Sequence, residues 1–163
     1  MADINLNHGL DETESVALVE LLFFAYRDFV ADPDQVLEGL GFGRAHHRVL
    51  HFVGRDPGMT VASLLEILKI TKQSLARVLK ELIAEGYVFQ KEGEQDRRQR
   101  LLHLTVLGEA LQQKLIAPQI ARFKRAAHEV NGGSSQNFRD LLFHLINPEN
   151  QNAAKQWIEN SHD

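Results

Sequence analysis

The chain has 163 residues, of which 44% are hydrophobic and 25% are charged, with a formal net charge of −4. These values fit a globular protein of one or two small domains. No stretch approaches the roughly 18–20 apolar residues of a transmembrane helix. The first residues lack the basic and apolar regions of a secretory signal, so we expect a cytoplasmic location. The absence of cysteine excludes disulfides, thiolate nucleophiles and thiol-based metal sites.

The N-terminal part of the chain predicts a long helix over residues 12–30. Its apolar side chains cover more than one side of that helix: Val16, Leu18, Val19, Leu21, Leu22, Phe23, Tyr26, Phe29 and Val30. This is more apolar surface than one small domain covers, so we expect the helix to contact a second surface.

A second helix is predicted over residues 42–53, and it carries neighbouring histidines. His47 and His51 are four positions apart and therefore share a helix face, next to His46. Such a pair can bind metal, but a site needs a third and usually a fourth ligand, and no Asp or Glu accompanies the pair locally. We therefore expect no metal and no cofactor.

Two helices separated by a short turn follow. Thr60 precedes a helix with Val61, Leu64, Leu65 and Leu68 at helical spacing, and Lys69-Ile70-Thr71 forms the turn, with Ile70 expected to be buried. Thr71 caps the second helix, whose apolar stripe is Leu75, Val78, Leu79, Leu82 and Ile83 and which ends at Gly86. The short turn is that of a helix-turn-helix.

The opposite face of the second helix is polar and mainly basic. Its side chains are Lys72, Gln73, Ala76, Arg77 and Lys80. An α-helix fits the DNA major groove, where Gln73 suits adenine and Arg77 suits guanine or phosphate.

Two strands are predicted next, over residues 87–91 and 100–104, because both segments are rich in apolar and aromatic side chains. The polar loop between them contains Gly93-Glu94-Gln95-Asp96-Arg97-Arg98. A basic hairpin tip beside such a helix can reach an adjacent minor groove. The segment therefore predicts a winged helix-turn-helix with double-stranded DNA as its partner.

The run Asp96-Arg97-Arg98, followed by Leu102-His103-Leu104-Thr105 and then Gly108, resembles the wing signature of MarR-family transcriptional regulators. The run from Leu82 to Val88 is similar to that family's helix-to-wing junction, and the resemblance covers residues 58–111. It implies that Asp96 orients Arg98, that Arg98 enters the minor groove, and that Arg97 contacts phosphate.

The sequence departs from the family pattern at one point of the recognition helix, which is the second helix of the predicted helix-turn-helix. Many members carry Thr-Arg where this chain has Ala76-Arg77. No threonine contact to DNA carries over, although Ala76 can meet a thymine methyl. The lack of cysteine also separates the chain from peroxide-sensing members, which depend on a reactive Cys.

Charge is segregated along the chain. Residues 40–108 hold 11 basic and 7 acidic residues, a net charge of +4, whereas the remainder holds 7 and 15, a net charge of −8. The basic charge of residues 40–108, within an otherwise acidic chain, favours salt-sensitive attraction of this segment to phosphates.

The C-terminal part predicts further helices. A long one covers residues 105–130, with Pro118 expected to kink or split it. Residues 131–135 form a break, a stripe from Phe138 to Ile146 predicts another helix, and a last short helix holds Trp157 and Ile158. We expect a mainly α fold with a small β-hairpin wing.

We divide the chain into a winged helix-turn-helix DNA-binding domain at 40–108 and a discontinuous helical dimerisation domain at 1–39 and 109–163. Apolar stripes at both ends are buried economically by a second copy in a two-fold homodimer. The resemblance implies the same arrangement, in which two winged helices read a pseudo-palindrome with half-sites roughly 10 bp apart.

The expected function is that of a DNA-binding transcriptional regulator, most simply a repressor that occupies a promoter. No phosphate loop, nucleophile elbow or catalytic carboxylate pair is present, so we expect no enzymatic activity. The alternatives are an activator of the same family and a winged-helix protein–protein interaction module.

The resemblance also implies a site for a small aromatic or acidic effector at the junction of the two domains. Its candidate residues are Tyr26, Arg27, His47 and His51. The alternative interpretation is that Tyr26 and the histidines satisfy buried hydrogen bonds at a helix junction.

Overall fold

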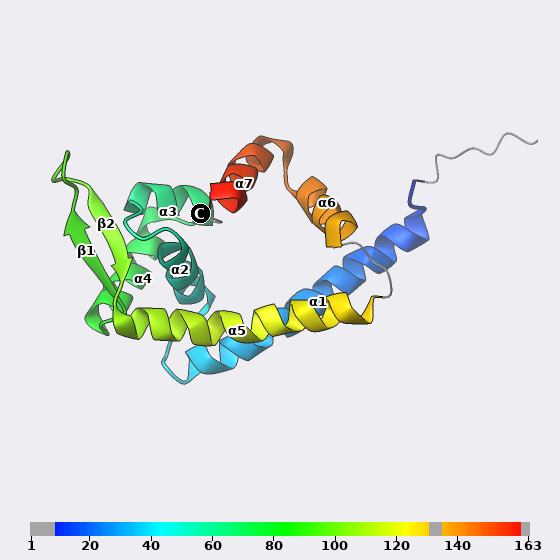
Figure 1. Ribbon diagram of the computed structural model, residues 1–163, viewed down its shortest axis with the longest axis horizontal. Helices are drawn as coiled ribbons and strands as arrows, with labels where there is room; N and C mark the ends of the chain where they lie inside the picture. Colours follow the sequence, from blue (N-terminus) through cyan, green and yellow to red (C-terminus); the bar gives the residue numbers. More distant parts are fainter. Residues whose placement is uncertain (1–8, 131–134, 161–163) are drawn as a thin grey trace, which may run out of the picture.

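The computed structural model describes residues 9–130 and 135–160, which form helices and one two-stranded hairpin (Figure 1). In chain order the elements are α1 (Glu12–Glu38), α2 (Arg44–Arg55), α3 (Val61–Leu68), α4 (Lys72–Ala84), β1 (Val88–Glu92), β2 (Arg100–Leu104), α5 (Val106–Glu129), α6 (Ser135–Leu145) and α7 (Pro148–Asn160). The expected fold class is confirmed. The break predicted at 131–135 lies outside the described residues except for Ser135, where α6 begins. Over the described residues, none of the helices combines the length and apolar character that crossing a membrane requires.

A core of buried apolar side chains joins α2, α3, α4 and the hairpin. Its members are Leu37, Val49, Leu50, Val53, Met59, Leu64, Leu75, Val78, Leu79, Leu82, Val88, Leu102, Leu104, Leu111 and Leu115. The predicted stripe of α4 is buried in it except at Ile83, and Ile70 in the preceding turn is partly buried against it. Leu37 comes from α1, and Leu111 and Leu115 come from α5. Both long helices are therefore anchored to the core that carries the helix-turn-helix.

The turn between α3 and α4 has the predicted caps. Thr60 Oγ1 accepts from the Ser63 backbone N–H, and Thr71 Oγ1 accepts from that of Ser74, each at 3.1 Å. Lys69 has the left-handed φ of 51°, which lets the chain turn sharply between the helices. Gly86, at φ +79°, adopts the left-handed conformation expected after α4.

Helix α1 is longer than the sequence suggested. It was expected to end at Val30, but it continues through Pro33 to Glu38. Proline has no N–H to donate to the carbonyl four residues earlier, which belongs to Phe29. The side-chain amide of Gln119 on α5 donates to that carbonyl at 3.4 Å. The neighbouring helix thus supplies the donor that the proline lacks.

Helix α5 also runs through its proline, so of the two outcomes expected at Pro118, a kink or a split, the split does not occur. Helices α1 and α5 cross each other and pack together (Figure 1), and α2 packs on α5. Packing along both neighbours keeps the helix continuous where its own hydrogen bonding is interrupted.

Helices α6 and α7 bring the chain back toward the helix-turn-helix (Figure 1). The Trp157 ring on α7 lies 5.2 Å from the Phe52 ring on α2. Both predicted C-terminal helices are confirmed.

Gly108 in the first turn of α5 is where the hairpin meets that helix. A Cβ at this position would lie 2.0 Å from the carbonyl oxygen of Tyr87. We expect Gly108→Ala to lower the free energy of unfolding by about 2–3 kcal/mol, because backbone must move to make room. Urea unfolding followed by circular dichroism measures this.

The control is Gly39→Ala. Gly39 has φ −61°, and the nearest atom to an added Cβ is at 3.6 Å, an ordinary contact. It should change stability by less than about 0.5 kcal/mol. Equal unfolding midpoints for the two variants would contradict the clash at Gly108.

Candidate nucleic-acid interface

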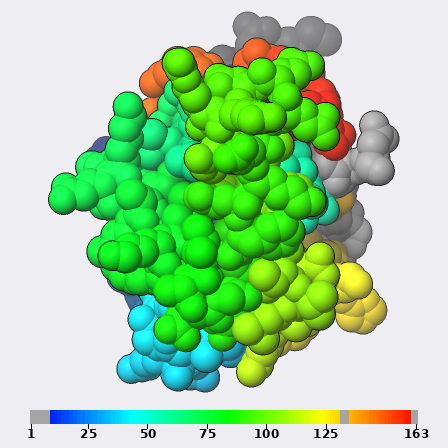
Figure 2. All heavy atoms as spheres, turned by 90° about the vertical axis from the view of Figure 1, so that its left-hand side faces the viewer, coloured from blue at the N-terminus to red at the C-terminus, as the bar shows by residue number. Residues whose placement is uncertain are grey.

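The polar face of α4 is open to solvent because its apolar face is buried in the core. Every side chain predicted to face DNA from this helix is exposed: Lys72, Gln73, Ala76, Arg77 and Lys80. Figure 2 looks onto the end of the molecule that carries α4 and the hairpin, whose green spheres occupy much of that face. Helix and hairpin tip are therefore accessible from one side.

Arg77 is held by a chain of polar contacts that reaches back to α2. Its Nη1 donates to Glu81 Oε1 at 3.0 Å, and Glu81 Oε2 lies 2.5 Å from His46 Nε2. His46 is 5% exposed and stacks on Phe42 with ring centroids 4.6 Å apart. The hydrogen bond from His46 is the main reason that the pKa of Glu81 is lowered, and Arg77 adds to the effect.

This contact chain could not be predicted from the sequence. No Asp or Glu stands near the histidines in the sequence, and Glu81 lies 35 positions from His46. His46 packs against Phe42 and reaches Glu81 on α4.

The hairpin tip is ordered by its own backbone and by Asp96. Asp96 Oδ1 accepts from the Arg98 backbone N–H at 2.9 Å, and the Asp96 carbonyl accepts from the Gln99 N–H at 3.0 Å. The resemblance implied that Asp96 orients Arg98. In the structure Asp96 holds the Arg98 backbone and not its side chain. The side chains of Arg97 and Arg98 are exposed.

Two further residues shape the tip, and the sequence analysis did not single them out. Arg100 Nη1 donates to the Arg97 carbonyl at 2.6 Å. A Cβ on Gly93 would lie 2.6 Å from the Asp96 carbonyl oxygen, so only glycine fits there. Gly93 could be recognised from the sequence, because a glycine at the start of a loop marks a close backbone approach.

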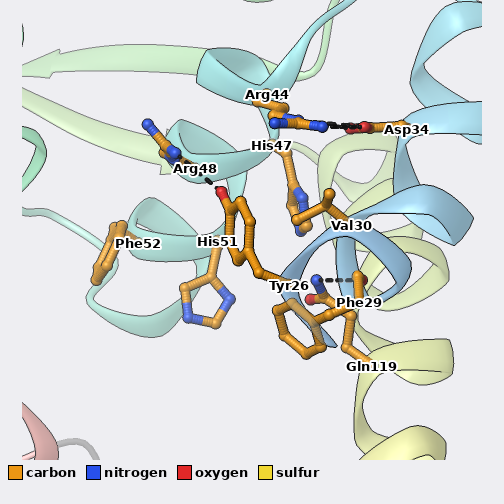
Figure 3. Close-up of a pocket in the computed structure, with 10 residues that line it drawn as sticks. All are labelled: Tyr26, Phe29, Val30, Asp34, Arg44, His47, Arg48, His51, Phe52 and Gln119. Atoms are coloured by element: carbon orange, nitrogen blue, oxygen red, sulfur yellow. Dashed lines mark hydrogen bonds and ion pairs between the residues drawn. The ribbon is translucent and has the colours of Figure 1, made fainter. Parts of the chain in front are cut away.

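A cavity of about 260 Å³ lies between α1, α2 and α5 (Figure 3). Its lining residues are Tyr26, Phe29, Val30, Asp34, Arg44, His47, Arg48, His51, Phe52 and Gln119. We call it the crevice. It brings together Tyr26, His47 and His51, three of the residues proposed for an effector. The fourth, Arg27, does not line it and instead pairs with Asp28 at 2.9 Å.

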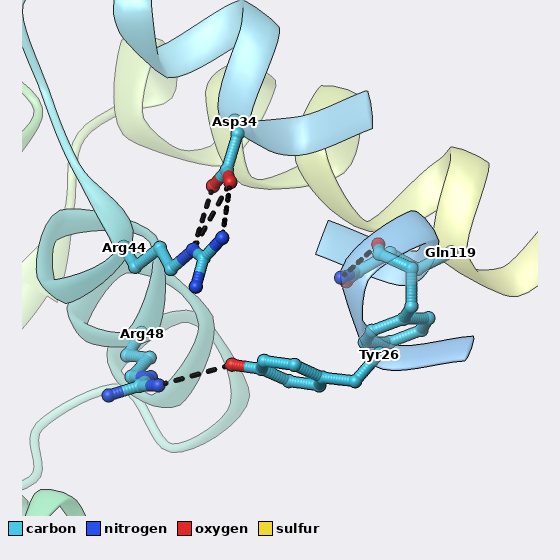
Figure 4. A network of polar contacts seen from close by, with 6 residues as sticks. Tyr26, Asp34, Arg44, Arg48 and Gln119 are labelled. Atoms are coloured by element: carbon cyan, nitrogen blue, oxygen red, sulfur yellow. Dashed lines mark hydrogen bonds and ion pairs between the residues drawn. The ribbon is translucent and has the colours of Figure 1, made fainter. Parts of the chain in front are cut away.

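The cations of the crevice are arginines (Figure 4). Arg44 donates to Asp34 Oδ2 through Nη2 at 2.9 Å and Nε at 3.1 Å, and Arg48 Nη2 lies 3.5 Å from the Tyr26 hydroxyl. Burial lowers the pKa of His47 and of His51, which favours neutral rings near pH 7.

Arg44 and Arg48 were not among the residues predicted for the effector site, although their spacing in the sequence could have identified them. With His47 and His51 they occupy positions i, i+3, i+4 and i+7 of one helix, a polar stripe on a single face. Asp34 and Gln119 carried no such signal because they reach the crevice from other helices. No group of three His, Asp or Glu side chains in the described part of the chain is arranged to hold a metal ion.

The arrangement of α3, turn, α4 and hairpin defines a winged helix-turn-helix protein. The MarR family model matches residues 40–99. The chain is 44% identical over 130 residues to the HTH-type transcriptional regulator PetP of Rhodobacter capsulatus, an alignment that covers 80% of this chain and 78% of PetP. The chain therefore belongs to the MarR family of transcriptional regulators.

Solved structures share the fold. An uncharacterised SlyA-like transcription regulator of Listeria monocytogenes superposes with a TM-score of 0.60 at 19% identity, covering 92% of this chain and 93% of the other. FabT of Streptococcus pneumoniae, crystallised in complex with DNA, superposes with a TM-score of 0.60 at 21% identity, covering 90% and 98%.

Proposed function

We propose that this protein regulates transcription as a homodimer that binds a pseudo-palindromic operator in double-stranded DNA, most simply as a repressor. The observation that carries the proposal is the exposure, on one side of the molecule, of the polar face of α4 and the Arg97–Arg98 tip. In this assignment Lys72, Gln73, Ala76, Arg77 and Lys80 face the major groove, and Arg98 enters the minor groove. We also propose the cytoplasmic location that the lack of a secretory signal favours.

The proposed domain division supplies the dimer. Helix α1 buries only residues near its C-terminal end, Val30, Pro33 and Leu37. Upstream, Val19 is 69% exposed and Phe23 is 64% exposed. Leu22, between them on α1, lines an apolar hollow together with Phe123 on α5 and Phe138 on α6. An apolar face of this extent needs a partner, and the same face of a second copy is complementary to it.

Dimerisation is tested by charging that face. We expect the native chain, of 18.5 kDa, to sediment with the mass of two copies, and the double variant Val19→Asp/Phe23→Asp to sediment as one. Val106→Asp is the matched control, because Val106 is 84% exposed outside the face. Native protein sedimenting as a single chain at micromolar concentration would rule out the dimer.

DNA binding is tested on fragments that the native protein selects from a random-sequence pool. We expect Arg98→Ala to weaken binding by about 1–3 kcal/mol in a fluorescence-polarisation titration, with dimer and helicity unchanged. Arg139→Ala, on exposed α6, removes the same charge away from the proposed interface. Unchanged affinity for Arg98→Ala would remove the wing from the mechanism.

The salt dependence of the native protein separates DNA binding from a protein-docking role. Phosphate contacts make affinity fall steeply as salt rises. A gel shift that appears at low salt and disappears at high salt supports the operator model. Absence of any shift at low salt would favour the protein–protein interaction module.

We further propose that the crevice binds a small aromatic acid that changes DNA affinity. Apolar walls from Phe29, Val30 and Phe52 suit a ring. Arg48, whose Nη2 lies 3.5 Å from the Tyr26 hydroxyl, suits a carboxylate. Occupation would alter how α2 sits against α1 and α5, and so the spacing of the two recognition helices.

Isothermal titration with benzoate and salicylate tests the crevice. We expect binding that His51→Ala weakens and Arg48→Gln weakens about tenfold or more, since a charge-assisted hydrogen bond contributes roughly 1.5–3 kcal/mol. Arg27→Gln is the matched control because Arg27 lies outside the crevice. No heat of binding in any of these proteins would retire the effector proposal.

A further inference from the structure

We propose that Glu81, fixed in place by the buried ring of His46, is a positioning residue for Arg77 and thereby sets the preference of the recognition helix for one base pair in each half-site. This inference deepens the proposed function and rests on it. It concerns two residues that would not themselves touch DNA.

The hydrogen bonds of His46 define the tautomer of its neutral ring. The Gly43 backbone N–H can only donate, and it points at His46 Nδ1 at 3.0 Å. Nδ1 must therefore carry the lone pair, which puts the proton of the neutral ring on Nε2. Nε2 then donates to Glu81 Oε2. Both ring nitrogens are used, each by a partner from a different part of the fold.

The ring has little freedom to leave this position. It is 5% exposed and stacks on Phe42, with 14° between the planes. Phe42 in turn meets Tyr87 edge-on at 5.5 Å. Gly43 precedes α2, so the bond to Nδ1 also closes the first turn of that helix. His46 is thus a rigid donor that is aimed at α4.

Glu81 transmits this rigidity to the DNA-facing surface. One carboxylate oxygen accepts from His46, and the other accepts from Arg77 one helical turn away. The Arg77 side chain remains 63% exposed, and one contact to Glu81 leaves most of its five N–H groups for a partner. A guanidinium held in one orientation loses less conformational freedom when it binds a guanine edge bidentately.

The same geometry has an opposing interpretation, in which Glu81 masks the charge of Arg77. Masking predicts that removing Glu81 strengthens binding to every DNA sequence. Positioning predicts that removing Glu81 erases one element of sequence preference. The two interpretations therefore differ in the sign of the effect and in its dependence on sequence.

Two substitutions of His46 separate its two hydrogen bonds. His46→Gln can place an amide N–H near the position of Nε2, which retains the donor to Glu81. His46→Asn can place an amide oxygen near Nδ1, which retains the acceptor for Gly43 and loses the donor to Glu81. The pair controls for disturbance of the helix start, since only His46→Asn breaks the chain of contacts to Arg77.

The first measurement uses the free protein. We expect the ¹⁵N order parameter of the Arg77 side chain to fall in Glu81→Ala and His46→Asn but to hold in His46→Gln. Glu85→Ala removes an acid from the end of the same helix and should leave Arg77 unchanged. Equal order parameters in all variants would overturn the positioning role, whether or not the protein binds DNA.

The second measurement uses DNA selected by the native protein and a set of single base-pair changes in it. We expect Arg77→Ala, Glu81→Ala and His46→Asn to lose about 5- to 10-fold of discrimination at the same base pair, and His46→Gln to retain it. Arg77→Ala/Glu81→Ala should lose no more than Arg77→Ala alone. Higher affinity of Glu81→Ala for all sequences, with discrimination intact, would establish masking and refute the proposal. Failure of the native protein to select DNA would refute the proposed function instead, and the order parameters would still decide the role of Glu81.

Discussion

The fold depends on the burial of one face of α4. Leu75, Val78 and Leu82 are almost completely removed from solvent against α2, α3 and the hairpin. Burying such side chains stabilises the folded state by roughly 1.5–3 kcal/mol each. It also fixes the rotation of the helix about its axis, so that Gln73 and Arg77 face outward. The same packing therefore supplies stability and the orientation of the polar face.

Helix α2 lies at the centre of this arrangement and makes contacts on three of its sides. Val49, Leu50 and Val53 enter the core, His46 reaches α4 through Glu81, and the face that carries Arg44 and Arg48 lines the crevice. A small displacement of this helix changes the crevice and the surroundings of Arg77 together, because densely packed elements move as units. An effector bound in the crevice would therefore need only to displace α2 in order to change DNA binding.

Local patterns predicted most of the elements, because apolar stripes, caps and turn residues act within a few positions of the chain. Thr60, Thr71 and Gly86 perform the roles expected of them. The failures concern long-range contacts: the sequence could not reveal that Gln119 compensates Pro33, or that Glu81 meets His46 across 35 positions. The arginines of the crevice could be predicted in part. Their spacing shows that they share one face of a helix, but the sequence does not show which helices lie opposite that face.

The Pro33 region joins the long helices to the crevice. Because Pro33 leaves the Phe29 carbonyl without its helical donor, Gln119 of α5 binds α1 at that point, and both Phe29 and Gln119 line the crevice. Beyond it, Asp34 holds Arg44 of α2, and Leu37 enters the core. If α1 had ended at Val30, neither Asp34 nor Leu37 would be held on the rigid helix that reaches α2. The continuation of α1 through a proline therefore links the exposed apolar face proposed for the dimer to the elements that carry the recognition helix.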